Sequence, residues 1–276
     1  MKRSAGKKNQ NAAPAPDGAT GGRTRTRGSS ARRWISAAVM VAVVFVLAGL
    51  VGEVVRNAKT TKLTPPSTAG GPSNLAVPVN GKAPITLTVY EDMRDPATVA
   101  FAQTYGAAMA QLIASGSVDV LYRQVAGVDA AKGGTGSLNA GNALGCAQDA
   151  GNGFFVAYRK VLLANQPAEQ TDAFADKGQL VTLAKQVKKL DTDVFRACVD
   201  SGAHNVWVKD STSDFTAANL GSVPVLTMKM IYQDDDTAQT LVGDGITTSP
   251  KKVVSEVLAA AKAAPTSSPS ASASAN

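Results

Sequence analysis

Two cysteines and one histidine are the side chains of this 276-residue sequence best suited to nucleophilic or redox chemistry: Cys146, Cys198 and His204. Because the sequence has a single histidine, any Ser-His or Cys-His catalytic pair would have to use His204. His204 lies near a predicted helix start, and we expect it in an exposed loop without a catalytic role. Two cysteines are too few for a disulfide-dense mini-protein or a multi-cysteine zinc module. The glycine-rich run at 133–136 lacks the Lys and Ser or Thr of a phosphate loop. We therefore expect no metal and no small-molecule cofactor.

A second group of candidate residues follows a predicted strand. Residues 85–90 (ITLTVY) alternate β-branched and apolar side chains, which predicts a strand, and we expect Glu91 and Asp92 at its solvated end. A helix is predicted next, because Asp is a favoured N-cap and Pro a favoured first helical residue. Its first turn comprises Asp95, Pro96, Ala97 and Thr98. These preferences indicate a helix start and no catalytic role for the four residues.

The positive charge of the chain is concentrated at its beginning. The formal net charge is +7, but residues 1–33 hold nine basic residues and one acidic residue, so the remaining 243 residues carry a net charge of −1. A fold with no excess of positive charge cannot neutralise many phosphates. The charge distribution therefore excludes a basic nucleic-acid-binding domain.

The segment that follows the basic tail predicts a membrane anchor. Residues 35–52 contain no charge and only Ser36 as a polar side chain, and as a helix they would span roughly 27 Å, close to a bilayer core. Trp34 directly follows two arginines, which places the N-terminus on the cytoplasmic side. We expect a single-pass anchor at 34–55 in a bacterial cell membrane, with the lipid bilayer as a partner and the C-terminal domain outside the cytoplasm. A cleaved secretory signal is the alternative, although its apolar core is usually shorter.

Composition divides the rest of the chain. Pro and Gly are enriched after the anchor, and Ser, Ala and Pro dominate the end. The predicted organisation is a disordered basic tail (1–33), the anchor (34–55), a linker (56–82), one folded domain (83–263) and a disordered tail (264–276).

The folded domain is predicted to be α/β. A strand at 85–90, the helix that starts at Asp95, and a strand at 117–125 form a βαβ unit with parallel strands. Strands at 225–231 and 240–243 and a helix that starts at Ser249-Pro250 follow later. Between these two halves lies a helical insertion at about 137–205. The helices predicted after the second strand span residues 139–150, 154–164, 179–190, 191–201 and 206–220.

This order is that of a thioredoxin fold with a helical insertion, and three stretches resemble the DsbA-like family of bacterial extracytoplasmic oxidoreductases. Residues 89–98 (VYEDMRDPAT) resemble the family's strand, acid pair and C-P-x-C motif. Residues 146–167 (CAQDAGNGFFVAYRKVLLANQP) resemble a helix that carries Phe and Tyr and leads to Asn-Gln-Pro. Residues 221–224 (GSVP) resemble the loop that holds the family's cis-proline. The resemblance covers residues 84–262 and implies a thioredoxin-like fold with an inserted α-helical subdomain, here preceded by one transmembrane helix.

The sequence departs from the family at the redox motif. The family has two cysteines where this chain has Asp95 and Thr98. Thiol exchange needs a thiolate that the helix N-terminus stabilises, and a second thiol three residues on that resolves the mixed disulfide. Asp and Thr can do neither. We expect a redox-inactive module without catalytic residues, which binds an extracytoplasmic polypeptide or envelope protein in a groove at Val223 and Pro224.

The two remaining cysteines leave a second function open. Cys146 and Cys198 are 52 residues apart in the predicted helical insertion. An oxidising compartment favours a structural disulfide between them, and the resemblance implies the same, since some relatives carry a second pair in the helical domain. Two buried free thiols are the alternative state. A disulfide oxidoreductase or isomerase that uses Cys146 and Cys198 is the alternative function.

Overall fold

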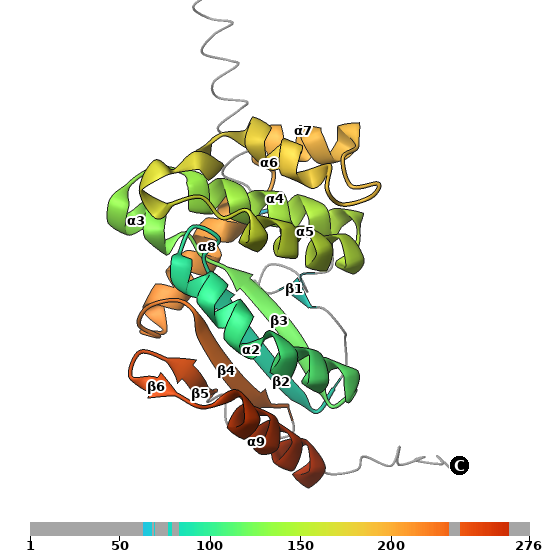
Figure 1. The fold of residues 1–276 in the computed structure, drawn as a ribbon, viewed down its shortest axis with the longest axis vertical. Helices are drawn as coiled ribbons and strands as arrows, with labels where there is room; N and C mark the ends of the chain where they lie inside the picture. Colours follow the sequence, from blue (N-terminus) through green and yellow to red (C-terminus); the bar gives the residue numbers. More distant parts are fainter. Residues whose placement is uncertain (1–62, 68, 70–76, 79–82, 232–237, 265–276) are drawn as a thin grey trace, which may run out of the picture. The chain divides into compact units, whose positions relative to one another are not determined.

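The computed structural model describes residues 63–67, 69, 77–78, 83–231 and 238–264. A mixed sheet lies at the centre of this part of the chain. Its six strands are arranged in the order β1-β3-β2-β4-β5-β6 (Figure 1). In chain order the strands are β1 (Val77–Pro78), β2 (Ile85–Glu91), β3 (Val118–Gln124), β4 (Val225–Met230), β5 (Gln239–Gly243) and β6 (Ile246–Thr247).

The first half of the sheet is the predicted βαβ unit. Strands β2 and β3 are parallel, in a register that runs from Ile85 opposite Val118 to Glu91 opposite Gln124. Helix α2 (Pro96–Ala114) connects them. Its Phe101, Tyr105, Met109 and Leu112 are buried against the apolar residues of the two strands, at the helical spacing of the sequence. The sequence therefore predicted both strands and the connecting helix.

The second half is the predicted ββα unit. Strand β4 is antiparallel to both β2 and β5. Helix α9 (Pro250–Ala263) begins after Ser249, whose hydroxyl accepts a hydrogen bond from the amide of Lys252. Val253 and Val257 of α9 are buried in the same core as the apolar side chains of α2. Helices α2 and α9 therefore cover the same face of the sheet (Figure 1).

The helical insertion lies between β3 and β4 and has a hydrophobic core of its own. This core contains the largest buried side chains of the domain, among them Phe155, Tyr158, Phe174 and Trp207. The insertion is confirmed, but it extends from α3 to α8 and is longer than 137–205. Its elements are α3 (Gly127–Lys132), α4 (Gly136–Ala150), α5 (Asn152–Ala164), η1 (Glu169–Thr171), η2 (Ala173–Ala175), α6 (Lys177–Ala184), α7 (Asp193–Ser201) and α8 (Asn205–Ala217).

One predicted helix is shorter than its apolar pattern indicated. Helix α6 ends at Ala184, and the chain continues to residue 190 in tight turns that include Lys189 with a φ of 71°. Val187 and Leu190 are nevertheless buried in the insertion core. Successive turns bury side chains at intervals close to the helical ones, so that the sequence pattern could not separate the two structures.

The domain begins before residue 83. Strand β1 pairs antiparallel with β3, with Val77 opposite Tyr122, inside the segment expected to be a linker. Proline is tolerated there because β1 is an edge strand. The predicted tail 1–33 and anchor 34–55 lie outside the described residues, as does the tail from residue 265 on. Within the part that is described, no helix is both long enough and apolar enough to span a bilayer.

Candidate functional site

The first turn of α2 has the predicted capping structure. The Asp95 carboxylate accepts a hydrogen bond of 2.8 Å from the amide of Ala97. Burial raises the pKa of Asp95 above its ordinary value, although the hydrogen bond from Ala97 acts in the opposite direction. From the insertion, Gln166 donates hydrogen bonds of 2.9 Å to the carbonyls of Met93 and Asp95. The turn is thus well fixed, but it carries no sulfur and cannot exchange disulfides.

The loop before β4 lies beside this turn, as the resemblance implied. The Val223–Pro224 peptide bond is cis. Val223 and Pro224 line a groove of about 360 Å³ together with Ala97 and Phe101 of α2 and Val242 of β5. The proximity of the two segments is what a thioredoxin fold provides. The role of Val223 and Pro224 in peptide binding stays a prediction.

The acid pair after β2 is buried, so the expectation of a solvated strand end was wrong. Glu91 has no exposed surface, and Arg159 Nε of α5 donates to both of its carboxylate oxygens at 2.8 and 2.9 Å. Gln124 of β3 donates a further hydrogen bond of 2.7 Å. Burial alone would lower the pKa of Arg159, but the charge and hydrogen bonds of Glu91 raise it above its ordinary value. The pair is therefore a charged salt bridge.

Asp92 is also buried, and no cationic side chain of the described residues contacts its oxygens. Burial raises its pKa from 3.8 to about 6, even though the backbone amides of Val128 and Arg94 each donate a hydrogen bond of 2.9 Å to it. The guanidinium of the nearby Arg94 instead forms salt bridges with the carboxylates of Asp129, at 3.0 Å, and Asp172, at 3.1 Å. These contacts join the start of α2 to α3 and to the turn before η2.

The two cysteines form a disulfide, which confirms the predicted pairing. Cys146 lies on α4 and Cys198 on α7, with their Cα atoms 5.8 Å apart. Cys146 is 3% exposed, whereas Cys198 is only partly buried. Val194, one turn before Cys198 on α7, is 80% exposed. Cys198 is therefore the more exposed of the two cysteines, and an exposed apolar side chain lies one turn away from it.

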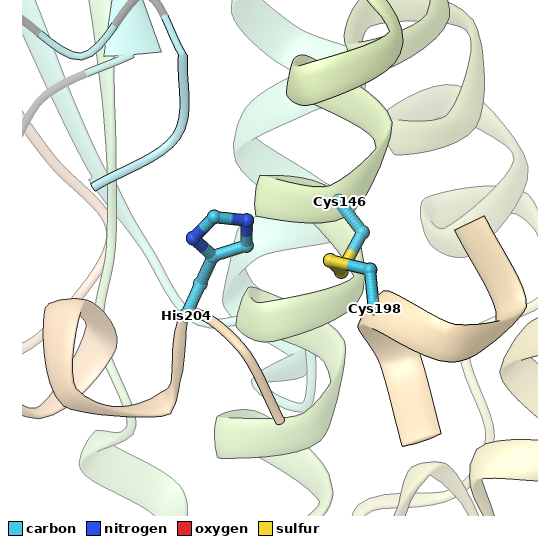
Figure 2. Close-up of side chains that lie close together, drawn as sticks. All are labelled: Cys146, Cys198 and His204. Carbon is cyan, nitrogen blue, oxygen red and sulfur yellow. A yellow bond between two sulfur atoms is a disulfide. The ribbon is translucent and has the colours of Figure 1, made fainter. Parts of the chain in front are cut away.

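His204 lies beside this disulfide and is 2% exposed, so the expectation of an exposed loop histidine was wrong. It is the N-cap residue of α8. Its ring packs against α4 at Gly145, where the absence of a side chain leaves room for it. One ring nitrogen and the two sulfurs all lie within 4.8 Å of one another. Figure 2 shows the three side chains together, with a ring nitrogen of His204 on the side that faces the disulfide.

Both ring nitrogens of His204 face acceptors. Nε2 is 2.8 Å from a carboxylate oxygen of Asp149 on α4, and Nδ1 is 2.7 Å from the carbonyl oxygen of Thr64. The amide of Ser67 donates a hydrogen bond of 2.8 Å to the other Asp149 oxygen. These two contacts fix the orientation of the ring beside the disulfide.

Sequence reasoning missed Asp149 and Thr64. Asp149 follows Cys146 by three residues, so the helix predicted at 139–150 already placed both on one face. That spacing could have identified Asp149. No signal of this kind exists for Thr64, because it contacts His204 across 140 residues of sequence.

The comparisons with known proteins identify the fold. A family model described as Thioredoxin matches residues 80–242, and no curated protein sequence matches the chain. The oxidised DsbA of Mycobacterium tuberculosis is 22% identical, with a TM-score of 0.54, over 69% of this chain and 94% of that one. The reduced DsbG of the same organism is 22% identical, with a TM-score of 0.54, over 71% and 91%. The MdbA protein of Actinomyces oris, a thiol-disulfide oxidoreductase, is 17% identical, with a TM-score of 0.55, over 73% and 92%.

These findings correct the expected function. We expected a redox-inactive binding module because the C-P-x-C cysteines are missing at Asp95 and Thr98. That conclusion was wrong, because the chain keeps a formed disulfide at Cys146 and Cys198, and the solved structures that it resembles are those of DsbA and DsbG. The motif position carries no cysteine, and the disulfide lies in the helical insertion. The chain belongs to the thioredoxin family and has the DsbA-like form of the fold, in which a helical insertion separates the two halves of the sheet.

Proposed function

We propose that this protein is a thiol-disulfide oxidoreductase whose exchanging pair is Cys146 and Cys198. The observation that carries the proposal is the disulfide between the only two cysteines of the chain, with His204 within 4.8 Å of both sulfurs. The similar proteins DsbG and MdbA are disulfide oxidoreductases, which supports the same class of reaction. The site differs from the family's motif position because it joins α4 to α7.

Exposure decides which sulfur reacts first. Cys198 is partly exposed and Cys146 is buried, so an incoming substrate thiolate attacks Cys198. The new bond joins the substrate sulfur to Cys198, and the electron pair of the broken bond leaves with Cys146 as a thiolate. A second substrate thiolate then attacks the substrate sulfur of the mixed disulfide and releases Cys198. The substrate gains a disulfide, the protein gains two thiols, and the reverse sequence reduces a substrate disulfide.

His204 lies beside the leaving sulfur, with one ring nitrogen within 4.8 Å of both sulfurs. The carboxylate of Asp149 and the carbonyl of Thr64 hold the ring in place. The exposed Val194 gives a polypeptide substrate an apolar contact one turn from Cys198. We propose extracytoplasmic polypeptides with thiols or disulfides as the substrates.

Two single variants test this assignment against each other. Cys146→Ser leaves Cys198 as the exposed free thiol, and Cys198→Ser leaves the buried Cys146. Both lose the same disulfide, so each controls for the stability lost by the other. We expect Cys146→Ser to accumulate mixed disulfides with a model peptide that carries a disulfide, because the Cys198 thiolate attacks that bond and releases one peptide thiol. Cys198→Ser should accumulate far fewer. Unchanged peptide oxidation and insulin reduction by both variants, relative to the wild-type chain, would show that this pair is not the redox centre.

We also propose that residues 34–55 anchor the domain outside the cytoplasm of a bacterial cell. The uncharged run at 35–52 after a basic tail supports this topology, and a disulfide is favoured in an oxidising compartment. Alkaline phosphatase, which is active only after export, should be active when fused after residue 264 and inactive when fused after residue 33. Activity of the second fusion, or inactivity of the first, would contradict the topology.

A further inference from the structure

Three metal-ligating side chains from three separate helices meet at the redox pair. Cys146 is on α4, Cys198 is on α7 and His204 caps α8. The two sulfurs and one ring nitrogen lie within 4.8 Å of one another (Figure 2), and both Cys146 and His204 are buried. In the oxidised protein the two sulfurs are bonded to each other. Reduction leaves two thiols close to the imidazole of His204.

This donor set matches the ligands of a zinc site. Thiolate and imidazole are the usual zinc ligands in proteins, at about 2.3 and 2.0–2.1 Å from the metal, which places the ligand atoms of one tetrahedral site roughly 3.5–4 Å apart. The present separations are within 4.8 Å. Opening of the disulfide moves the sulfurs apart, and a shift of about 1 Å brings the histidine nitrogen into range.

The surroundings of His204 also match those of a metal ligand. Histidines that bind metals commonly donate the N–H of their other nitrogen to a carbonyl or carboxylate, which fixes the ring. Here Nδ1 lies 2.7 Å from the carbonyl oxygen of Thr64, so that Nε2 is left for the metal. Nε2 now contacts an oxygen of Asp149 at 2.8 Å, which puts a carboxylate beside the metal position. The amide of Ser67 holds the second oxygen of Asp149.

We propose that the reduced pair binds one zinc ion through Cys146, Cys198 and His204, with the carboxylate of Asp149 beside the site. A dithiol reductant first gives two electrons and two protons to the disulfide and is itself oxidised to a disulfide. Zinc then displaces the two thiol protons, and no electron moves to the metal. The disulfide joins α4 to α7 in the oxidised state, and the metal would join α4, α7 and the start of α8 in the reduced state.

Metal binding would regulate the proposed function, on whose redox-accessible pair it rests. Two thiolates that ligate zinc are poorer nucleophiles than free thiolates, so zinc would hold the pair in its reduced form and slow its reoxidation. The site would then respond to zinc and to the redox state of its compartment together.

The test uses the full chain, reduced with a dithiol, freed of reductant without oxygen and titrated with Co²⁺ and then Zn²⁺. We expect one Co²⁺ per reduced chain, with the absorption of thiolate-to-cobalt charge transfer, and displacement by Zn²⁺. The oxidised chain should give no such absorption. His204→Asn and Asp149→Asn should each weaken zinc binding by about 10- to 100-fold. Asp200→Asn, which changes an exposed carboxylate on α7, should have no effect.

A measurement on the wild-type chain alone keeps the proposal testable if a variant does not fold. One equivalent of zinc should slow alkylation of Cys198 at least tenfold. Equal alkylation rates with and without zinc, or equal zinc affinity of wild type and His204→Asn, would overturn the proposal. Zinc binding needs no turnover of a substrate, so a chain that binds zinc but exchanges no disulfides would refute the proposed function and leave the metal site standing.

Discussion

Gly145 leaves the space that the His204 ring occupies beside the disulfide. A Cβ atom at this position would lie 2.8 Å from Cδ2 and 2.9 Å from Cγ of the His204 ring. The ring also has fixed partners on its other sides, at Thr64 and Asp149. It therefore cannot move away without loss of hydrogen bonds. A single missing side chain on α4 thus allows the histidine and the two sulfurs to meet.

We expect Gly145→Ala to destabilise the protein by about 1–3 kcal/mol and to lower the rate of disulfide exchange, because the added methyl group displaces the ring. Gly106→Ala on α2 is the matched control, since nothing lies within 4 Å of its Cβ position. That substitution should stabilise the helix by roughly 0.5–1 kcal/mol. Urea unfolding measures both effects, and equal behaviour of the two variants would contradict the packing argument.

Asp92 should make the stability of the fold depend on pH. Its pKa is raised by burial from 3.8 to about 6, so the folded protein binds a proton more tightly than the unfolded chain between these values. This stabilising effect is complete below about pH 4 and is lost as the pH rises through 6. The shift corresponds to roughly 3 kcal/mol at neutral pH.

Asp92→Asn removes this titration, since an amide does not ionise. The stability of the variant relative to wild type should therefore rise by roughly 3 kcal/mol from about pH 4 to pH 7. Denaturant unfolding at intervals across that range measures the difference. Asp200→Asn, at an exposed carboxylate, should follow the wild-type curve. If the free energies of unfolding of Asp92→Asn and wild type changed in parallel with pH, ionisation of Asp92 would not destabilise the fold.

Strand β2 and helix α5 are joined by the buried pair of Glu91 and Arg159. The guanidinium contacts both carboxylate oxygens and lies 4.5 Å from the ring centroid of Tyr122 on β3. Glu91 has no exposed surface. A buried ion pair contributes little net stability, but removal of one partner leaves an uncompensated charge. The pair therefore fixes how the insertion is attached to the sheet.

Arg159→Met should destabilise the domain by about 3–5 kcal/mol, because it leaves the Glu91 carboxylate buried without its cation. Lys160→Met, the next residue on α5 and exposed, should change stability by less than about 0.5 kcal/mol. The double variant Glu91→Leu/Arg159→Met should be more stable than Arg159→Met alone. Thermal unfolding of the three variants gives the comparison, and a double variant weaker than the single one would contradict the charge explanation.

Local signals in the sequence predicted the elements of the sheet well. Asp95-Pro96 and Ser249-Pro250 marked the starts of α2 and α9, and alternation marked β2 and β3. Contacts between distant segments had no such signals. The sequence places Glu91 at the end of a strand, where a solvated side chain is expected, but Arg159 of α5 contacts it in the fold. In the same way, His204 is buried because Gly145 and Thr64 lie against it. The fold was therefore predictable, whereas the surroundings of the disulfide were not.

The disulfide links distant parts of the insertion, and this has a consequence for the whole domain. The bond closes a loop of 52 residues between α4 and α7. In the chain-entropy description, such a loop stabilises the folded state by about 4 kcal/mol, chiefly by restricting the unfolded chain. The same free energy must appear in the reduction potential, because folding favours the disulfide as much as the disulfide favours folding. The folded pair should therefore be harder to reduce than the same pair in the unfolded chain, by roughly 90 mV.

The direction of the proposed exchange follows from this coupling. A disulfide that folding stabilises makes its dithiol form a strong reductant, so the pair should reduce or isomerise substrate disulfides more readily than it oxidises thiols. We expect the reduced chain, with a metal chelator present, to unfold at a lower urea concentration than the oxidised chain, by about 4 kcal/mol. The double variant Cys146→Ser/Cys198→Ser should unfold at the same urea concentration as the reduced chain, and added reductant should not change that concentration. Equilibration with glutathione buffers, in native solution and in denaturant, gives the two potentials. Equal potentials in the two conditions would refute the coupling, and a native potential above the denatured one would make the protein an oxidant instead.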